Sequence, residues 1–537
     1  MSDPEAMNQL PSTPLQSGAA DKPPMSWGSR RKRKSEIGAG PEAAQGQGKI
    51  MRAATPVPVV VWLGLLALAV GGAFTPNPAL AVGSVLMLPL LFKLLWRRGE
   101  APLLLIACFG QWLQVVMPLI VANYYGQPLE GYFDIPLRNE ATWLGLIGVA
   151  AFALGARFAL YGCVLSVGPT MEQEVIGFTV NRLFLAWLFS LAIAVPVEII
   201  ERLMPGLTQV IGPILGIKSG FVFLLGYAVI RQRRGYAMFA IAVVTEFVIG
   251  TLGYFSGFTQ VLIVLLVLLL TVMRHLTLGA DLLSFLALAA VMISSATVWS
   301  AIKPGYRDFM NGGSGKQDVV VPLTQRLDYL STHILAMNEN NFSDAFQATL
   351  VRIGYTEYFA DTLKNVPAEV PYERGRLWLD AVTRVFMPRM FFPNKPAADD
   401  SYRTQKYAGV DVAGPEQGTS IGMGYMAESY VDFGRYLMFL PIFLLALLFG
   451  LAYRYFVLRG GRGAWGYVIA FAMPFASLHM FETSNIKLFG PLVSCAILFV
   501  PLDYYFGQSI KAWLRGGAAS LPARLRGKRR QEQGHGL

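Results

Sequence analysis

Three neighbouring blocks of the sequence contain the residues whose types and spacing could do chemistry. The blocks are residues 372–378, 388–396 and 419–434. In the second block, Pro388 and Pro393 flank aromatic side chains, a pattern typical of a rigid segment at a membrane surface. Arg389 and Lys395 place two cations beside these apolar residues. Because arginine binds phosphate with a two-pronged fork and lysine acts as a point charge, this block suits a ligand with an apolar tail and an anionic head.

These two cations have an alternative role. Basic residues next to a membrane commonly contact lipid headgroups. Asp399 and Asp400 also follow closely enough in the sequence to pair with them. The sequence alone therefore leaves open whether Arg389 and Lys395 bind a ligand or hold this segment in place.

The third block contains two acidic residues that could act on a proton. Glu428 and Asp432 are four residues apart, which places them on one face of a helix. A carboxylate held just outside a membrane could take a proton from a sugar hydroxyl, as a general base does. The alternative is that both are early acidic residues of a helix, where they favour the positive end of its dipole. The sequence leaves both roles open.

Three other polar features stand apart from these blocks. Glu246 lies in the middle of an apolar segment, where a carboxylate is either functional or the buried partner of another helix. His333 is the one histidine between residues 303 and 434, and a lone histidine is more often a surface residue than a base. Arg403 and Gly414 match an arginine-x10-glycine spacing, but two fixed residues in a glycine-rich chain carry almost no information.

The elements that must position these residues are apolar helices. Hydrophobic residues make up 54% of the 537 residues and charged residues only 15%, whereas a soluble protein carries about 25% charged residues. Most of the apolar segments are roughly 16 to 21 residues long, near the length that crosses the hydrocarbon core. The segments are residues 57–74, 80–96, 103–122, 143–161, 183–200, 221–230, 237–254, 258–273, 282–302, 437–457, 465–481 and 488–506. The short segment 221–230 is expected to borrow residues from 204–217, a stretch broken by proline and glycine that could be re-entrant. We therefore predict an all-α polytopic membrane protein with about twelve transmembrane helices.

The charges between these segments predict the topology. Basic residues follow the second, sixth, eighth, tenth and twelfth segments and so lie on one side of the membrane, which the positive-inside rule makes the cytoplasm. We expect an inner-membrane protein with both termini in the cytoplasm and its long connection in the periplasm. The predicted parts are a disordered basic tail (1–55), a first membrane block of about nine helices (56–302), a periplasmic loop domain (303–436), three last helices (437–507) and a second basic tail (508–537).

Composition and missing motifs exclude several classes of protein. The net charge of +11 comes largely from basic runs near the two ends, which lack the interleaved aromatic residues of a nucleic-acid site. The sequence has no nucleotide-binding lysine loop, no His-Glu-x-x-His and no Gly-x-Ser-x-Gly, which argues against an ATP-driven pump, a zinc protease and a serine hydrolase. Its three cysteines form no metal-ligand cluster. We expect no cofactor, no metal and no nucleic-acid partner.

Parts of the three blocks resemble the oligosaccharide repeat-unit polymerases, the Wzy-type family of O-antigen and exopolysaccharide polymerases. These parts are Gly375-Arg376-Leu377-Trp378, Pro388 to Pro396, and Thr419 to Gly434. The motifs fall within residues 375–434, and the predicted topology, with one large late periplasmic loop, extends the resemblance over most of the chain. The resemblance implies an architecture like that of the GT-C membrane glycosyltransferases.

The resemblance also implies an activity. Such proteins join glycan repeat units carried on undecaprenyl diphosphate, passing the growing chain to a sugar hydroxyl of the next unit without nucleotide or metal. Glu428 would then be the base and Arg389 the second catalytic residue, because cations must stabilise the leaving diphosphate. The residues expected to contact the substrate are Arg374, Arg376, Lys395, Tyr430 and Asp432. The implied partners are membrane lipids and, in the same pathway, a flippase and a chain-length regulator.

Two other functions compete with this one. An O-antigen ligase shares the helix count, the loop and the lipid-diphosphate donor, but attaches finished glycan to the lipid A core; the three blocks favour the polymerase. A transporter or flippase of lipid-linked oligosaccharide should place polar residues in the middle of the membrane and often has internal repeats. Here charge inside the apolar segments is sparse and the polar residues gather in one loop, which favours an enzyme.

Overall fold

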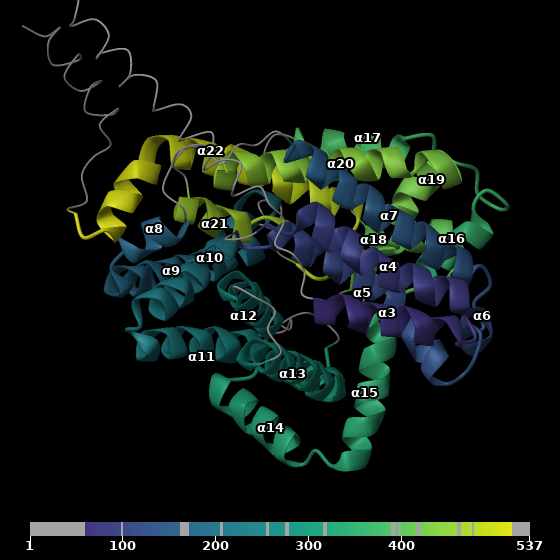
Figure 1. The fold of residues 1–537 in the computed structure, drawn as a ribbon, viewed down its shortest axis with the longest axis horizontal. Helices are drawn as coiled ribbons and strands as arrows, with labels where there is room; N and C mark the ends of the chain where they lie inside the picture. Colours follow the sequence, from purple (N-terminus) through teal and green to yellow (C-terminus); the bar gives the residue numbers. More distant parts are fainter. Residues whose placement is uncertain are drawn as a thin grey trace, which may run out of the picture. The chain divides into compact units, whose positions relative to one another are not determined.

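Helices form every regular element in the parts of the chain that the computed structural model describes (Figure 1). These parts are residues 59–97, 100–161, 171–203, 208–253, 257–273, 279–314, 319–387, 392, 394–395, 399–414, 419–458, 463–474 and 477–517. The predicted N-terminal tail lies outside the described residues, as do residues 518–537 of the predicted C-terminal tail.

Eight helices of the described chain are long and apolar enough to cross a membrane. They are α4 (Pro78–Leu95), α5 (Leu103–Tyr124), α7 (Arg138–Ala159), α9 (Val180–Leu203), α10 (Thr208–Gln232), α13 (Ala280–Met310), α20 (Phe439–Tyr453) with its π-helical continuation (Arg454–Leu458), and α22 (Asn485–Leu514). Three shorter apolar helices are α3 (Val59–Ala73), α11 (Tyr236–Leu252) and α12 (Phe258–Val272). The chain is therefore a helical membrane protein, as predicted.

Two predicted segments differ from the observed helices. Among the described residues of the predicted segment 465–481, the α-helix is α21 (Gly463–Phe471), nine residues long. It ends before Pro474, which has no backbone N–H to continue a helix. As expected, the short segment 221–230 borrows residues from the preceding stretch: α10 is one helix from Thr208 onward, without the re-entrant break that this stretch could have formed. Its glycines serve close packing instead of breaking the helix: a Cβ added to Gly216 or Gly220 would lie 2.5 Å or 2.4 Å from a backbone atom near α21.

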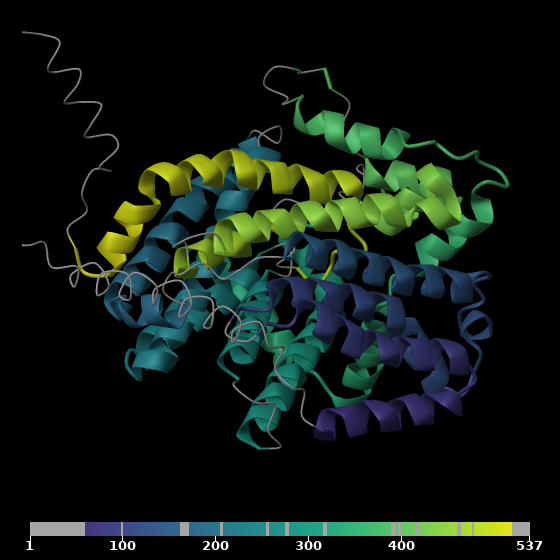
Figure 2. The same ribbon diagram turned by 45° about the horizontal axis from the view of Figure 1, so that its top comes forward.

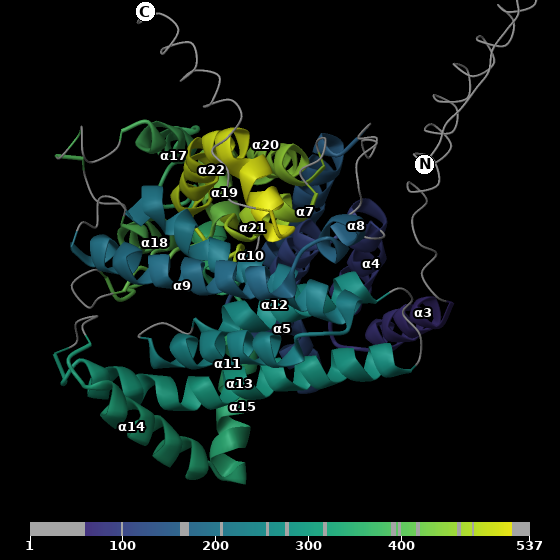
Figure 3. The same ribbon diagram turned by 90° about the vertical axis from the view of Figure 1, so that its left-hand side faces the viewer.

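The predicted loop domain forms further helices that pack directly on the apolar ones. These helices are α14 (Leu323–Leu335), α15 (Glu339–Ile353), α16 (Glu357–Asn365), α17 (Arg376–Val385), α18 (Asp400–Ala408) and α19 (Tyr425–Leu437); the short helices α6 (Leu129–Phe133) and α8 (Met171–Ile176) lie elsewhere. Helix α15 packs on α5 and α13, α16 on α7 and α18, and α17 on α22. Figures 2 and 3 both show α17 lying beside α22. The polar segment is thus built onto the apolar helices.

Gly424 directly precedes α19, and its backbone conformation and surroundings both disfavour any other residue. Gly424 has φ +91°, and a Cβ at this position would lie 2.4 Å from the carbonyl oxygen of Phe481. We expect Gly424→Ala to lower the free energy of unfolding by about 2 kcal/mol or more, through backbone strain and overpacking together. Thermal unfolding of the detergent-solubilised protein measures this. Gly414→Ala is the matched control, because nothing lies within 4 Å of its Cβ position; equal melting temperatures for both variants would refute the steric account.

Candidate functional site

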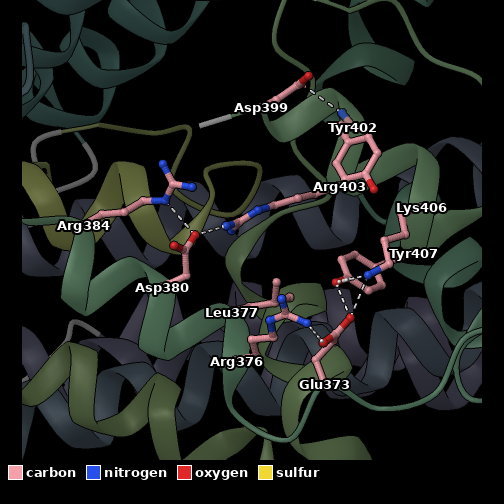
Figure 4. A pocket seen from close by; sticks show the side chains of 10 residues that line it. All are labelled: Glu373, Arg376, Leu377, Asp380, Arg384, Asp399, Tyr402, Arg403, Lys406 and Tyr407. Carbon is pink, nitrogen blue, oxygen red and sulfur yellow. Dashed lines mark hydrogen bonds and ion pairs between the residues drawn. The ribbon is translucent and has the colours of Figure 1, made fainter. Parts of the chain in front are cut away.

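A pocket of about 400 Å³ lies between α17 and α18 (Figure 4). Four cationic side chains and three carboxylates line it, so opposite charges nearly balance across its wall. The lining residues are Glu373, Arg376, Leu377, Asp380, Arg384, Asp399, Tyr402, Arg403, Lys406 and Tyr407. All of them come from the segment that the sequence predicts to be a loop domain.

The spacing of residues in α17 turns one charged stripe toward the pocket. Arg376, Asp380 and Arg384 follow one another at intervals of four residues and line the pocket together with the buried Leu377, whereas Ala381 is buried and is not part of the lining. Gly375 precedes the helix with φ +92°. The carboxylate of Asp432 accepts hydrogen bonds from the backbone N–H groups of Leu377 (3.1 Å) and Trp378 (2.9 Å). Asp432 therefore caps α17 and ties it to α19.

Helix α18 supplies the opposite wall of the pocket. Asp399 caps its first turn by accepting from the backbone N–H of Tyr402 (3.0 Å), and Gly409 ends it with φ +71°. One carboxylate between the two helices gathers several donors. Glu373 accepts from the Lys406 ammonium (2.8 Å) and the Tyr407 hydroxyl (2.7 Å), and the hydrogen bond from Lys406 lowers the pKa of Glu373. Arg376 lies 3.7 Å from the same carboxylate.

Arg403 connects the pocket to a buried carboxylate behind it. Its Nη2 pairs with the Asp380 Oδ2, the same oxygen that accepts from the Arg384 Nε at 2.7 Å. Its Nη1 donates to the Glu428 Oε1 at 3.2 Å, and the Glu428 Oε2 accepts from the backbone N–H of Asn485 at 2.7 Å. Ion pairs therefore connect α17 to α18 and α18 to α19. A backbone hydrogen bond then connects Glu428 to the start of the apolar helix α22.

Glu428 is 1% exposed, and its surroundings change its acidity. Burial raises the pKa of this carboxyl to about 7, although the positive charge of Arg403 acts in the opposite direction. The neighbouring Asp400 raises the pKa further, and is itself paired with Lys487 at 2.7 Å. A carboxylate that titrates near pH 7 can accept a proton near neutral pH, as a general base must.

Three residues at or next to the contacts of this carboxylate carry buried polar atoms without partners. Within the described part of the chain, the Asn485 amide, the Ser484 hydroxyl and the Asp400 Oδ1 make no hydrogen bond, and all three side chains are at least 98% buried. Unpaired buried polar groups are costly, so they suit an added hydroxyl group or water molecule. The described ranges contain no group of three or more His, Cys, Asp or Glu side chains placed to hold a metal ion.

Residues 152–482 match the profile of a family described as a domain of unknown function (DUF8712). The chain belongs to the DUF8712 family. No curated protein and no solved structure matches the chain. The DUF8712 region takes up more than half of the sequence and includes α17, α18 and α19, with the pocket between the first two and Glu428.

The cations predicted in this DUF8712 chain fall in three different surroundings. Arg376 lines the pocket, with 79% of its side chain exposed. The Lys395 ammonium donates to the backbone carbonyls of Arg384 (2.6 Å) and Met387 (3.0 Å) and so holds the end of α17. Arg374 is exposed in the turn before α17, with φ +53°. Arg389 lies outside the described residues.

The remaining predicted residues lie away from the pocket lining. The Tyr430 hydroxyl is buried and donates to the backbone carbonyl of Val366 at 2.7 Å. Glu246 accepts from the Lys218 ammonium (2.8 Å) and the Trp187 indole (3.0 Å), which fits its alternative role as a buried partner between helices. His333 lies exposed on α14. Asp432 makes the cap described above.

The sequence did not identify Arg403, the central residue of the site, as a candidate functional residue. Its spacing to Gly414 was visible in the sequence, but nothing there indicates that this arginine meets Glu428. The spacing of Arg376, Asp380 and Arg384 was also present, and would have identified a charged helix face once α17 was recognised as a helix. Pairing across α17, α18 and α19 depends on the tertiary fold.

The Asp432 cap gives a separate test of how the pocket is held. We expect Asp432→Ala to lower the free energy of unfolding by about 1–2 kcal/mol, because two backbone donors at the start of α17 lose their acceptor. Thermal unfolding and limited proteolysis near α17 measure this. Asp411→Ala, which removes an exposed acid near α18, is the control. An Asp432→Ala protein as stable as this control would show that the cap is dispensable.

Proposed function

We propose that this DUF8712 protein is a membrane glycosyltransferase that polymerises oligosaccharide repeat units carried on undecaprenyl diphosphate. The observation that carries the proposal is Arg403, which joins a cation-lined pocket to a buried carboxylate with a pKa of about 7. A diphosphate leaving group needs fixed cations, and a sugar hydroxyl needs a base. The proposed product is O-antigen, capsule or exopolysaccharide, made in the same pathway as a flippase and a chain-length regulator.

The pocket suits the head of the donor and the outer side of α17 suits its tail. Arg376, Arg384 and Lys406 join Arg403 in offering cations to the two phosphate groups. Leu379 and Phe386, on the outward side of α17, are 64% and 67% exposed. A polyprenyl chain can lie against these apolar side chains while its diphosphate enters the pocket. This arrangement supports a lipid-linked donor over a soluble nucleotide sugar.

The proposed reaction moves one glycosyl group and one proton. A hydroxyl oxygen of the acceptor sugar attacks the anomeric carbon of the donor glycan, and the bond from that carbon to the phosphate oxygen breaks. The electron pair leaves with undecaprenyl diphosphate, whose charge the pocket cations stabilise. Glu428 takes the proton from the acceptor hydroxyl. The lengthened glycan stays on the lipid diphosphate of the acceptor and serves as the next donor.

The proposed topology has about twelve segments in the inner membrane, both termini in the cytoplasm, the pocket facing the periplasm and a GT-C-like arrangement. The eight long and three shorter apolar helices support the number of segments. We assign the remaining segment to α21 and the irregular residues 477–484 that follow it. They lie along α5: the Phe481 N–H donates to the Gln114 Oε1 at 3.2 Å, and Gly110 abuts the backbone of Leu478. Irregular backbone at membrane depth is tolerated where it is buried in protein in this way.

Reconstitution tests this proposal. The purified protein in proteoliposomes receives an undecaprenyl-diphosphate-linked repeat unit, and the products are separated by size. A ladder of chain lengths is expected. Transfer of a single finished glycan to a lipid A core acceptor would indicate a ligase, and movement of the substrate across the bilayer without a covalent change would indicate a transporter. Either of these results in place of a ladder would overturn the proposal.

A further inference from the structure

Both oxygens of Glu428 are occupied in the structure. The Oε1 accepts from Arg403 at 3.2 Å and the Oε2 accepts from the backbone N–H of Asn485 at 2.7 Å. The side chain is 1% exposed. Each of these two donors stabilises the charged carboxylate, so Glu428 becomes a stronger base when one of them withdraws. The Asn485 N–H belongs to the backbone at the first residue of the long helix α22, so the donor that can move is the Arg403 side chain.

Arg403 also faces the pocket, where an anion would compete for it. Its second nitrogen pairs with Asp380, and that carboxylate is shared with Arg384. The cations lining the pocket are matched by nearby carboxylates, so an incoming anion must draw them away from these partners. Arg403 pairs with both a pocket carboxylate, Asp380, and Glu428. A phosphate group offers its guanidinium two oxygens in the geometry that arginine prefers.

We propose that Arg403 couples anion binding in the pocket to the basicity of Glu428, so that a diphosphate draws the guanidinium away and leaves that carboxylate oxygen free to take the proton of the acceptor hydroxyl. This inference rests on the proposed function, because the diphosphate would be the headgroup of the donor. Arg403 acts here as a positioning residue for Glu428 as well as a ligand for the phosphate. Glu428 therefore becomes a stronger base only after the donor has arrived, which orders the two substrates.

The charges around Glu428 fix the direction of the effect. Arg403 and Asp400 face it from α18, and the Asn485 N–H faces it from α22; Lys487 pairs with Asp400. Withdrawal of Arg403 removes the positive charge that favours the carboxylate and leaves the negative charge of Asp400. The pKa of Glu428, about 7 with Arg403 in place, must then rise. Slightly above neutral pH, and with no acceptor present, anion binding is therefore accompanied by proton uptake from the buffer.

Calorimetry with inorganic pyrophosphate tests this linkage. The full-length protein in nanodiscs is titrated at pH 7.5 in buffers of different ionisation enthalpy, which gives the number of protons taken up per bound pyrophosphate. The readout is the difference between wild type and Glu428→Gln, because protonation of pyrophosphate itself contributes to both. We expect wild type to take up about half a proton more than Glu428→Gln. Arg403→Gln should also lose this excess, since it has no cation to withdraw, and serves if Glu428→Gln does not fold.

A matched pocket variant separates this coupling from simple charge loss. Arg384→Gln removes a pocket cation that forms an ion pair with Asp380. It should bind pyrophosphate several-fold more weakly and still show the excess proton uptake. Equal uptake in wild type, Glu428→Gln and Arg403→Gln, with pyrophosphate bound to all three, would overturn the coupling and leave the proposed function standing. Failure of pyrophosphate to bind the wild type at all would overturn both.

Discussion

Replacing Arg403 with alanine is expected to reduce polymer formation by about 100-fold or more, a loss typical of removing one charge-stabilising donor from an active site. The substitution removes the two interactions that Arg403 makes with Asp380 and Glu428. The pocket loses the cation between Asp380 and Glu428, and Glu428 keeps only the Asn485 N–H. The rate of product formation in proteoliposomes, at saturating lipid-linked donor, measures the effect.

Two further variants show whether the loss concerns chemistry or folding. Arg403→Lys keeps the positive charge but cannot form the two parallel hydrogen bonds of a guanidinium group. Its rate should therefore lie between those of Arg403→Ala and wild type. Arg435 pairs with Glu140, in the first turn of α7, at 2.7 Å. Arg435→Gln removes this pair and should retain the wild-type rate. If Arg403→Ala produced polymer at a rate close to that of Arg435→Gln, the pocket would not be the site of transfer.

Glu428→Gln is expected to lower the turnover number by about 100-fold to 10,000-fold, the contribution of a general base. It should also change the pH profile. Because the pKa of Glu428 in the free protein is raised to about 7, the wild-type kcat/KM should increase as pH rises through this value and level off above it. Glutamine cannot be deprotonated, so the residual rate of the variant should be flat across the same range. Initial rates between pH 5.5 and 8.5 decide this.

The same titration affects stability with the opposite sign. The folded protein holds the proton of Glu428 up to about pH 7, whereas the unfolded chain releases it near the ordinary value of 4.5. The free energy of unfolding should therefore fall as pH rises between these values, and Glu428→Gln should remove this part of the decline. If the wild-type rate did not change with pH near 7, or if Glu428→Gln had unchanged turnover, Glu428 would not be the base. Its role would then be to pair with Arg403 in the folded protein.

The apolar helices were predictable because their signal lies in local composition. Long runs of hydrophobic residues indicate helices wherever they occur, and α5, α7 and α13 lie where such runs were found. The segment around α21 was not predictable in the same way. Its residues are apolar enough for a full crossing, but Pro474 ends the helix and the chain continues as irregular backbone held by α5. Composition does not distinguish a helix from a buried irregular segment.

The site was predictable only in part, because its pairs form between separate helices. Glu428 and Arg376 were candidates from their motif blocks, and the structure places Arg376 in the pocket and Glu428 directly behind it. The partner of Glu428 was not recognisable, since Arg403 lies 25 residues away and outside those blocks. Asp432 and Lys395 show the converse. Both have charges that suit a phosphate or a hydroxyl, yet both bind the backbone at the ends of α17.

The most direct test of the central claim compares the amount of undecaprenyl diphosphate released with the number of glycosidic bonds formed. Purified protein in proteoliposomes is given a synthetic undecaprenyl-diphosphate repeat unit, and released undecaprenyl diphosphate and new glycosidic bonds are quantified in the same reaction. If the pocket transfers glycosyl groups, one lipid diphosphate is released for each bond formed, and Arg403→Ala and Glu428→Gln lose both products together. Consumption of the substrate without release of lipid diphosphate, or equal release by wild type and both variants, would contradict the account.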